Sequence, residues 1–201
     1  LIPRLYDATE GEVLVDGVNV KDYSIEALRD KVGIVMQKAV LFKGTIRENM
    51  RMGNKTATDE QIDEALAISQ SKEFVDSKEG RLDYQIEQGG KNLSGGQRQR
   101  LTIARANVKK PDVLILDDSA SALDFATDAA LRKAIGGMDN SPTVFIVSQR
   151  AASLMHADLI IVLEDGQVAG MGTHEQLLDN CEIYKEIYDS QFKKEGSQGG
   201  V

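Results

Sequence analysis

The residues Leu93-Ser94-Gly95-Gly96-Gln97 carry the strongest chemical signal in this 201-residue chain. Ser94 is a residue type that caps helices, and an apolar helix is expected to follow from about residue 96 to residue 107. Two glycines at the front of a helix leave backbone N–H groups uncovered. Such a helix end binds phosphate through these amides and through the helix dipole. An ordinary Ser-Gly-Gly turn into a helix is the alternative interpretation.

A second signal is the apolar run Val113-Leu114-Ile115-Leu116, which ends in Asp117 and Asp118. Ligands of parallel sheets bind at the carboxyl ends of the strands, where an acidic pair in this position would lie. Asp117 can therefore hold a hydrated Mg²⁺, as the Walker B aspartate does in P-loop enzymes. The alternative is that a carboxylate caps a helix after a core strand.

The elements that must position these motifs alternate between strand and helix. Asp16-Gly17 predicts a strand that enters a turn, Ser24 is expected to cap a helix, and Thr58 with Gln61 forms a capping box. The 80s are expected to be loop, with a break at Gly89-Gly90. Strands are expected at 32–36, 113–116, 144–147 and 159–163, and helices at 25–30, within 45–80, at 96–107, at 127–135 and after Thr173. Fully apolar strands between helices predict a parallel sheet that helices cover on both faces.

The composition excludes several classes of protein. The chain has 41% hydrophobic and 28% charged residues, which is ordinary for a globular domain. Its apolar runs have the length of strands and fall short of the roughly 20 residues that cross a bilayer. A net charge of −8 argues against a dedicated nucleic-acid binder. The single cysteine, Cys181, cannot form an internal disulfide and suits a reducing compartment.

Taken in order, the motifs resemble those of the ATP-binding cassette (ABC) ATPase family over nearly the whole chain. Leu93 to Gln97 matches the signature motif, Val113 to Asp117 matches Walker B, Gln37 matches the Q-loop, and Ser121 to Asp124 matches the D-loop. The stretch from Leu41 to Asn49 looks like the exporter branch, as does Gly172-Thr173-His174-Glu175. His174 itself and His156 are expected to be surface or capping residues rather than catalytic ones.

The resemblance implies an α/β fold of the P-loop NTPase (RecA-like) type. It has a parallel-sheet core, an ABC α-helical subdomain and a remnant antiparallel β segment. We expect one domain over residues 1–201. Its parts are a β and core segment at 1–37, the helical subdomain at 38–107, the Walker B, D-loop and switch core at 108–195, and a frayed tail at 196–201.

The resemblance also implies ATP and Mg²⁺ as cofactors. Gln37 and Asp117 are the implied metal ligands, and Asp118 and Gln149 take the catalytic positions. The residues implied in nucleotide binding are Gln37, Ser94, Gly95, Gly96, Gln97 and Asp124. In this family each ATP lies between the P-loop and Walker B of one domain and the signature motif of another, so the expected partner is a second ABC nucleotide-binding domain.

One departure from the family is the lack of the P-loop pattern G-x-x-x-x-G-K-[ST]. The only Gly-Lys pair is Gly90-Lys91, which Asn92 follows, and no glycine precedes it by five residues. In the family the P-loop directly precedes a segment that resembles residues 1–7. We therefore expect the chain to be truncated, with a P-loop upstream of Leu1.

Two further departures concern the same chemical step. Asp118 stands where active members have a glutamate, and its shorter side chain changes the reach by a distance of about 1 Å, which can reduce a rate on the order of 100-fold. Gln149 stands where active members have a histidine, and it can donate a hydrogen bond but cannot become a cation. These changes predict a site that binds ATP and hydrolyses it slowly, as in the degenerate half of a heterodimeric exporter.

The expected function is therefore to couple ATP binding and hydrolysis to export, together with a transmembrane domain of the same or an associated chain. This places the chain at the cytoplasmic face of the cell membrane, with no nucleic-acid partner. Three alternatives stay open: a soluble ABC ATPase, a nucleotide-binding regulatory module that does not hydrolyse ATP, and a homodimer with two slow sites.

Overall fold

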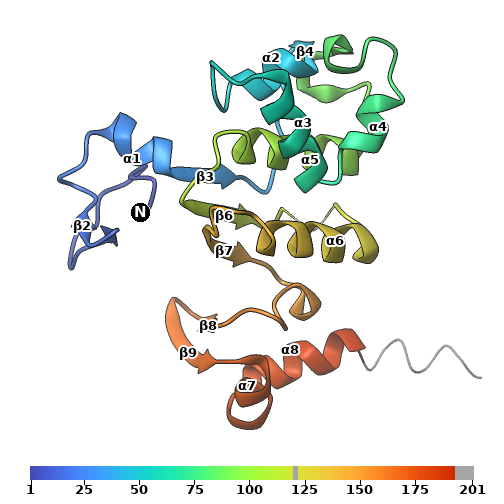
Figure 1. Cartoon of the computed structure of the whole chain (residues 1–201). Coiled ribbons are helices and arrows are strands. Elements are labelled where there is room, and N and C mark those ends of the chain that lie inside the picture. Colours follow the sequence, from blue (N-terminus) through green and yellow to red (C-terminus); the bar gives the residue numbers. More distant parts are fainter. Residues whose placement is uncertain (120–121, 193–201) are drawn as a thin grey trace, which may run out of the picture. The chain divides into compact units, whose positions relative to one another are not determined.

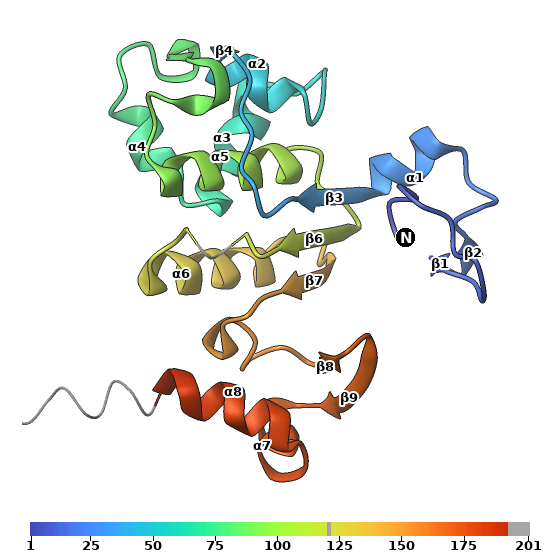
Figure 2. The same ribbon diagram turned by 180° about the vertical axis from the view of Figure 1, so that it is seen from behind.

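A computed structural model describes residues 1–119 and 122–192, and Figures 1 and 2 show its ribbon from two sides. The chain divides into two compact units, residues 1–147 and residues 148–201. Ser121 of the expected D-loop and the tail at 196–201 lie outside the described residues. The finer division at residues 37, 107 and 195 stays a prediction.

The first unit is built on a parallel sheet of three strands in the order β3-β6-β7 (Figure 1). The strands are β3 (Val32–Val35), β6 (Val113–Asp117) and β7 (Thr143–Val147). In the register, Val35 lies opposite Leu116, and Leu116 lies opposite Ile146. The three strands predicted from the sequence are confirmed to within one residue at most ends.

Two helices bury one face of this sheet. They are α5 (Gly95–Asn107) and α6 (Phe125–Gly136). Ile103 of α5 and Leu131 of α6 share one buried cluster with Leu114 and Leu116 of β6. Because these strand residues alternate with Val113 and Ile115, both helices bury the same face of the sheet.

The opposite face of the sheet is open, and the expectation of helices on both faces is wrong for the described residues. Phe145 and Val147 of β7 are 45% and 55% exposed, and Ile34 of β3 is 36% exposed. The N-terminal segment buries only the end of this face, where Val32 and Val113 pack with Leu28 and its neighbours.

That N-terminal segment consists of a short hairpin and a helix. The hairpin joins β1 (Leu14–Val15) to β2 (Val18–Asn19), and Asp16 and Gly17 between them have φ of 51° and 75°. Left-handed conformations at both central residues define the tight turn that an Asp-Gly pair favours. Helix α1 (Ile25–Lys31) follows, and the Ser24 side chain accepts a hydrogen bond from the Ala27 amide as predicted.

A helical segment lies between β3 and α5 in the sequence. It contains β4 (Gly44–Thr45), α2 (Ile46–Arg51), α3 (Asp59–Ile68), α4 (Lys72–Asp76), the 3₁₀ turn η1 (Arg81–Asp83), β5 (Gln85–Ile86) and the 3₁₀ turn η2 (Gln88–Gly90). Its buried residues form one cluster with the outer side of α5, through Leu101, Ala104 and Val108. The Thr58 capping box is confirmed. The predicted loop in the 80s instead includes a strand, since β5 pairs with β4.

The second unit contains η3 (Ala151–Ser153), the antiparallel pair β8 (Ile160–Glu164) and β9 (Gln167–Gly172), and the helices α7 (His174–Asn180) and α8 (Glu182–Phe192). Its core joins Ile160 and Val162 to Leu177, Cys181 and Tyr184. Across 1–119 and 122–192, no helix is both long and apolar enough to cross a membrane.

Candidate functional site

The front of α5 carries a complete capping box. The Ser94 hydroxyl accepts a hydrogen bond from the Gln97 amide (3.2 Å), and the Gln97 side-chain oxygen accepts one from the Ser94 amide (3.0 Å). The amides of Gly95 and Gly96 have no hydrogen-bond partner within the described part of the chain. Two helix-front N–H groups and the proton of the Ser94 hydroxyl are therefore available to an anion.

Packing inside the chain does not require glycine at these two positions. A Cβ atom on Gly95 would meet only the Arg98 guanidinium, at 3.9 Å, and one on Gly96 would meet the Ala122 carbonyl at 3.4 Å. Neither residue has a positive φ. Because glycine weakens a helix relative to alanine, its use here is best explained by the close approach of a group from outside the chain.

The carboxyl ends of β3 and β6 bring together residues that are far apart in the sequence. Gln37 follows β3, and its Nε2 donates a hydrogen bond to Oδ2 of Asp118, which follows β6 (3.0 Å). Asp118 has a left-handed φ of 43°, and its amide donates to the Val147 carbonyl at the end of β7 (2.8 Å). The predicted site residues Gln37, Asp117 and Asp118 thus share one edge of the sheet.

The oxygen atoms at this edge fit a magnesium ion. Because Nε2 of Gln37 points to Asp118, its Oε1 is left as a ligand, and Asp117 on the neighbouring strand adds a carboxylate. Mg²⁺ prefers oxygen ligands and commonly uses one or two from protein, with water and phosphate completing its shell. Among the described residues no group of three or more His, Cys, Asp or Glu side chains could hold a metal alone.

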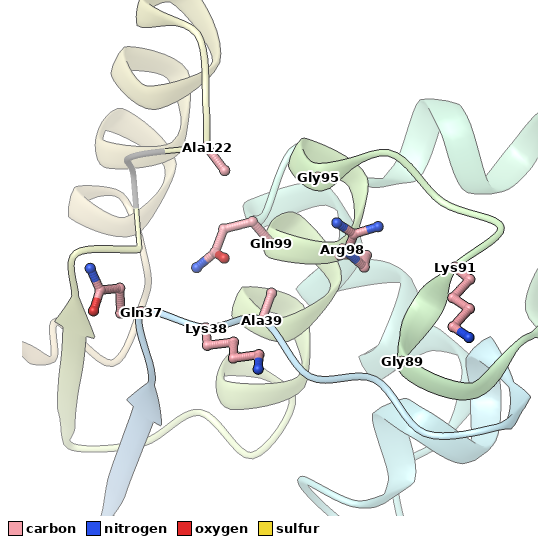
Figure 3. Close-up of a pocket in the computed structure, with 9 residues that line it drawn as sticks. All are labelled: Gln37, Lys38, Ala39, Gly89, Lys91, Gly95, Arg98, Gln99 and Ala122. Carbon is pink, nitrogen blue, oxygen red and sulfur yellow. The ribbon is translucent and has the colours of Figure 1, made fainter.

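A cavity of about 400 Å³ connects the two parts of the site, because both Gln37 and Gly95 line it (Figure 3). Lys38, Lys91 and Arg98 add positive charge to its wall. This arrangement suits a negatively charged group in the space between the end of β3 and α5.

Gln99 is a residue of this cavity that the sequence interpretation missed. Its side chain is 2% exposed, and Nε2 has no hydrogen-bond partner among residues 1–119 and 122–192. In Figure 3 the amide of Gln99 points away from α5, toward the side where Gln37 lies. The buried residues of α5 also include the polar residues Thr102 and Asn107, so the sequence alone did not single out Gln99.

Asp124 has a local role in the structure. It caps α6, since Oδ1 accepts a hydrogen bond from the Thr127 amide (2.9 Å) and Oδ2 accepts one from the Thr127 hydroxyl (2.8 Å). These bonds from Thr127 hold the pKa of Asp124 below its usual value. Its predicted contact with a nucleotide stays a prediction.

Gln149 belongs to the second unit, where its carbonyl accepts a hydrogen bond from Nε2 of Gln191 (2.7 Å). This bond ties the residues after β7 to α8 within that unit. This bond involves only the main chain of Gln149. The catalytic role of its side chain stays a prediction.

Known proteins resemble the chain over most of its length. A family model described as "ABC transporter" matches residues 1–121. The chain is 43% identical, over 98% of its length, to the uncharacterized ABC transporter ATP-binding protein YfiB of Bacillus subtilis. It is 39% identical, over 95% of its length, to a putative multidrug export ATP-binding/permease protein of Staphylococcus aureus.

A solved structure of a bacterial Atm1-family ABC exporter with ATP bound matches 95% of the chain with a TM-score of 0.90 and 32% sequence identity. The chain covers 34% of that exporter chain, 34% of the Bacillus protein and 33% of the Staphylococcus protein. It therefore spans about a third of the length of these relatives.

Proposed function

Since the chain belongs to the ABC transporter family, we propose that it is the ATP-binding and ATP-hydrolysing domain of an exporter. In this role it couples ATP binding and hydrolysis, at an interface between two such domains, to the export of a substrate across a membrane. The relatives named as export ATP-binding/permease proteins and the Atm1-family exporter support this proposal.

The front of α5 is the observation that carries the proposal. Ser94, Gly95 and Gly96 offer a hydroxyl and two unpartnered amides in one place, and the glycines leave room for close approach. We assign this surface to the terminal phosphate of an ATP held by a second nucleotide-binding domain. Gln97 maintains this surface through the capping box, and Asp124 contacts the same nucleotide.

The edge formed by Gln37 and Asp117 serves an ATP that this chain itself helps to hold. Both residues would hold Mg²⁺ through oxygen atoms, and the ion would neutralise charge on the phosphates. Asp118 and Gln149 occupy the two catalytic positions.

We further propose that this chain is the slow half of a heterodimer. Asp118 is shorter than a glutamate, and one of its carboxylate oxygens already accepts a hydrogen bond from Gln37. Gln149 can donate a hydrogen bond but cannot carry a proton as a histidine does. Two weakened groups at one chemical step favour tight nucleotide binding with slow turnover, while α5 supports fast turnover at the partner's site.

The test is ATP turnover by the purified heterodimeric transporter. Changing the partner's catalytic glutamate to glutamine is expected to remove nearly all turnover, since displaced catalytic groups reduce rates by on the order of 100-fold. Asp118→Asn is expected to change turnover little. A large loss from Asp118→Asn would show that this chain's own site is catalytically active.

The remaining partner is a transmembrane domain, on the same chain or an associated one, which places the ATP-binding domain at the cytoplasmic face of the membrane.

A second candidate function is a nucleotide-binding regulatory module that never hydrolyses ATP, which Asp118 and Gln149 both favour. Measuring ATP binding separately from phosphate release distinguishes the two, because a module of that kind binds ATP and releases no phosphate even with its partner.

A further inference from the structure

Three arginines of α5 hold backbone carbonyls of segments outside the helix. Nη1 of Arg98 donates to the Leu93 carbonyl (2.7 Å), and Nη1 of Arg100 donates to the Gln70 carbonyl (2.6 Å). Nη2 of Arg105 donates to the Val40 carbonyl (2.9 Å), 65 residues away in the sequence. Each arginine thus joins the helix to a different loop.

The contact of Arg105 with Val40 has a cost in desolvation of the guanidinium group. Burial lowers the pKa of Arg105, and its Nη1 is buried without a hydrogen-bond partner in the described part of the chain. None of the ion pairs found among these residues neutralises it. The guanidinium carbon lies 5.9 Å from the centre of the Phe42 ring, which compensates only in part. A partly buried cation that none of these ion pairs neutralises contributes little to stability, so a role other than stability is the better explanation for it.

The segment that Arg105 holds is attached at three successive residues. The Val40 carbonyl is bound by Arg105, the Leu41 carbonyl accepts from the Gly89 amide (3.1 Å), and both main-chain groups of Phe42 bond to the side chain of Asn49 (2.9 Å each). Within the described residues, Val40 is the first residue after Gln37 that is bonded to another element. Apart from the bond of Gln37 itself to Asp118, the attachment closest to Gln37 on its C-terminal side is therefore the one from α5.

We propose that Arg105 is a positioning residue that fixes Gln37 relative to α5, so that the metal-binding edge and the phosphate-binding helix front form one rigid unit. The inference rests on the proposed function, in which Gln37 holds Mg²⁺ beside ATP. Without Arg105, the residues between β3 and Leu41 lose their link to α5. Gln37 would then be held only by β3 before it and by its bond to Asp118, and its Oε1 would be less well placed to ligate Mg²⁺.

The test variant is Arg105→Met, which keeps an unbranched apolar side chain but removes the charge and all donors. The first measurement is the thermal unfolding midpoint, which is expected to stay unchanged or to rise because a partly buried charge without an ion-pair partner is removed. The second is the spectrum of a nitroxide attached to Lys38→Cys, with Cys181 buried and unlabelled. This spectrum is expected to shift toward fast motion.

The third measurement is the Mg²⁺ concentration that gives half-maximal ATP binding, in a transporter whose partner has lost its own P-loop lysine. We expect this concentration to rise about tenfold, as it does when groups that orient metal ligands are removed. Arg105→Lys still reaches the Val40 carbonyl and is expected to restore most of both effects.

Arg100→Met is the matched control. Arg100 lies on the same helix, binds the Gln70 carbonyl and lies 5.1 Å from the centre of the Phe74 ring, so it makes the same kinds of contact with a different segment. It is expected to leave the Lys38 label and the Mg²⁺ dependence unchanged.

The possible results distinguish a failure of the proposed function from a failure of the role proposed for Arg105. If the unsubstituted transporter binds no ATP, the proposed function fails. If it binds ATP and Arg105→Met leaves both the label spectrum and the Mg²⁺ dependence unchanged, the positioning role is refuted. If Arg105→Met mainly lowers the unfolding midpoint and Arg105→Lys does not restore binding, Arg105 is a structural residue only.

Discussion

Single residues at the front of α5 contribute differently to folding and to the proposed phosphate contact. The capping box uses Ser94 and Gln97 to satisfy two helix-front amides. Gly95 and Gly96 contribute little to folding, since a methyl group would fit at either position without a severe clash. In the proposed function Ser94 therefore serves both folding and nucleotide contact, whereas Gly95 and Gly96 serve nucleotide contact alone, so substitutions of the glycines can separate the two.

Gly96→Ala is expected to leave the free energy of unfolding unchanged or to raise it by up to about 1 kcal/mol, because alanine favours the helix. ATP turnover by the assembled dimer is expected to fall on the order of 100-fold, since the added methyl group keeps the phosphate about 1 Å away. Urea unfolding and a phosphate-release assay measure the two effects. Gly136→Ala in α6 is the control, because a Cβ there meets no atom within 4 Å. Normal turnover by Gly96→Ala would contradict the assignment of the phosphate to this surface.

At the same scale, the sequence predicted which residues lie at the strand ends but not how they interact. Gln37, Asp117 and Asp118 were expected at strand ends, and the structure places them there. The bond between Gln37 and Asp118 joins residues 81 positions apart, so it depends on the register of β3 and β6. Arg105 was missed for a similar reason, because its partner is a carbonyl, and every residue has one.

At the scale of elements, the sequence predicted the helix caps and the main strands correctly, but it missed the shortest strands. The caps at Ser24, Thr58, Ser94 and Thr173 are confirmed, because a cap depends on residues only three positions apart. Strands β4 and β5 were missed because each has two residues and pairs only through tertiary contact. The predicted α/β P-loop NTPase class, with its parallel sheet, is confirmed.

One buried side chain bonds to three main-chain groups of the connection from β3 to α2. Asn49 is fully buried, accepts a bond from the Phe42 amide, and donates to the carbonyls of Phe42 and Thr45. Asn49→Ala leaves three main-chain groups without this partner. We therefore expect a loss of about 3 kcal/mol in the free energy of unfolding.

Urea unfolding checks this value, and Lys55→Ala is a suitable comparison because Lys55 is exposed. Such surface changes usually stay within about 0.5 kcal/mol. If Asn49→Ala had no larger effect than Lys55→Ala, the side-chain bonds of Asn49 would not be what holds this connection.

At the scale of the whole molecule, charge separates the proposed function from that of a soluble ABC ATPase on DNA or ribosomes. The chain has 32 acidic and 24 basic side chains. Electrostatic attraction to phosphate backbones supplies most non-specific nucleic-acid binding. We expect no retardation of duplex DNA or ribosomal RNA in a gel-shift assay at roughly 1 μM protein and physiological salt. Binding that weakens steeply as salt increases would favour the soluble alternative.

The open face of the sheet has a practical consequence for anyone who produces this chain alone. Strand β7 ends the described sheet, and it presents Phe145 and Val147 to solvent. A strand whose outer edge has no partner in the described sheet, and which exposes aromatic and β-branched side chains, is a template for contact with other copies. Overproduction of residues 1–201 by themselves therefore favours inclusion bodies. Co-expression with a protein segment that covers β7 is expected to give more soluble, folded protein.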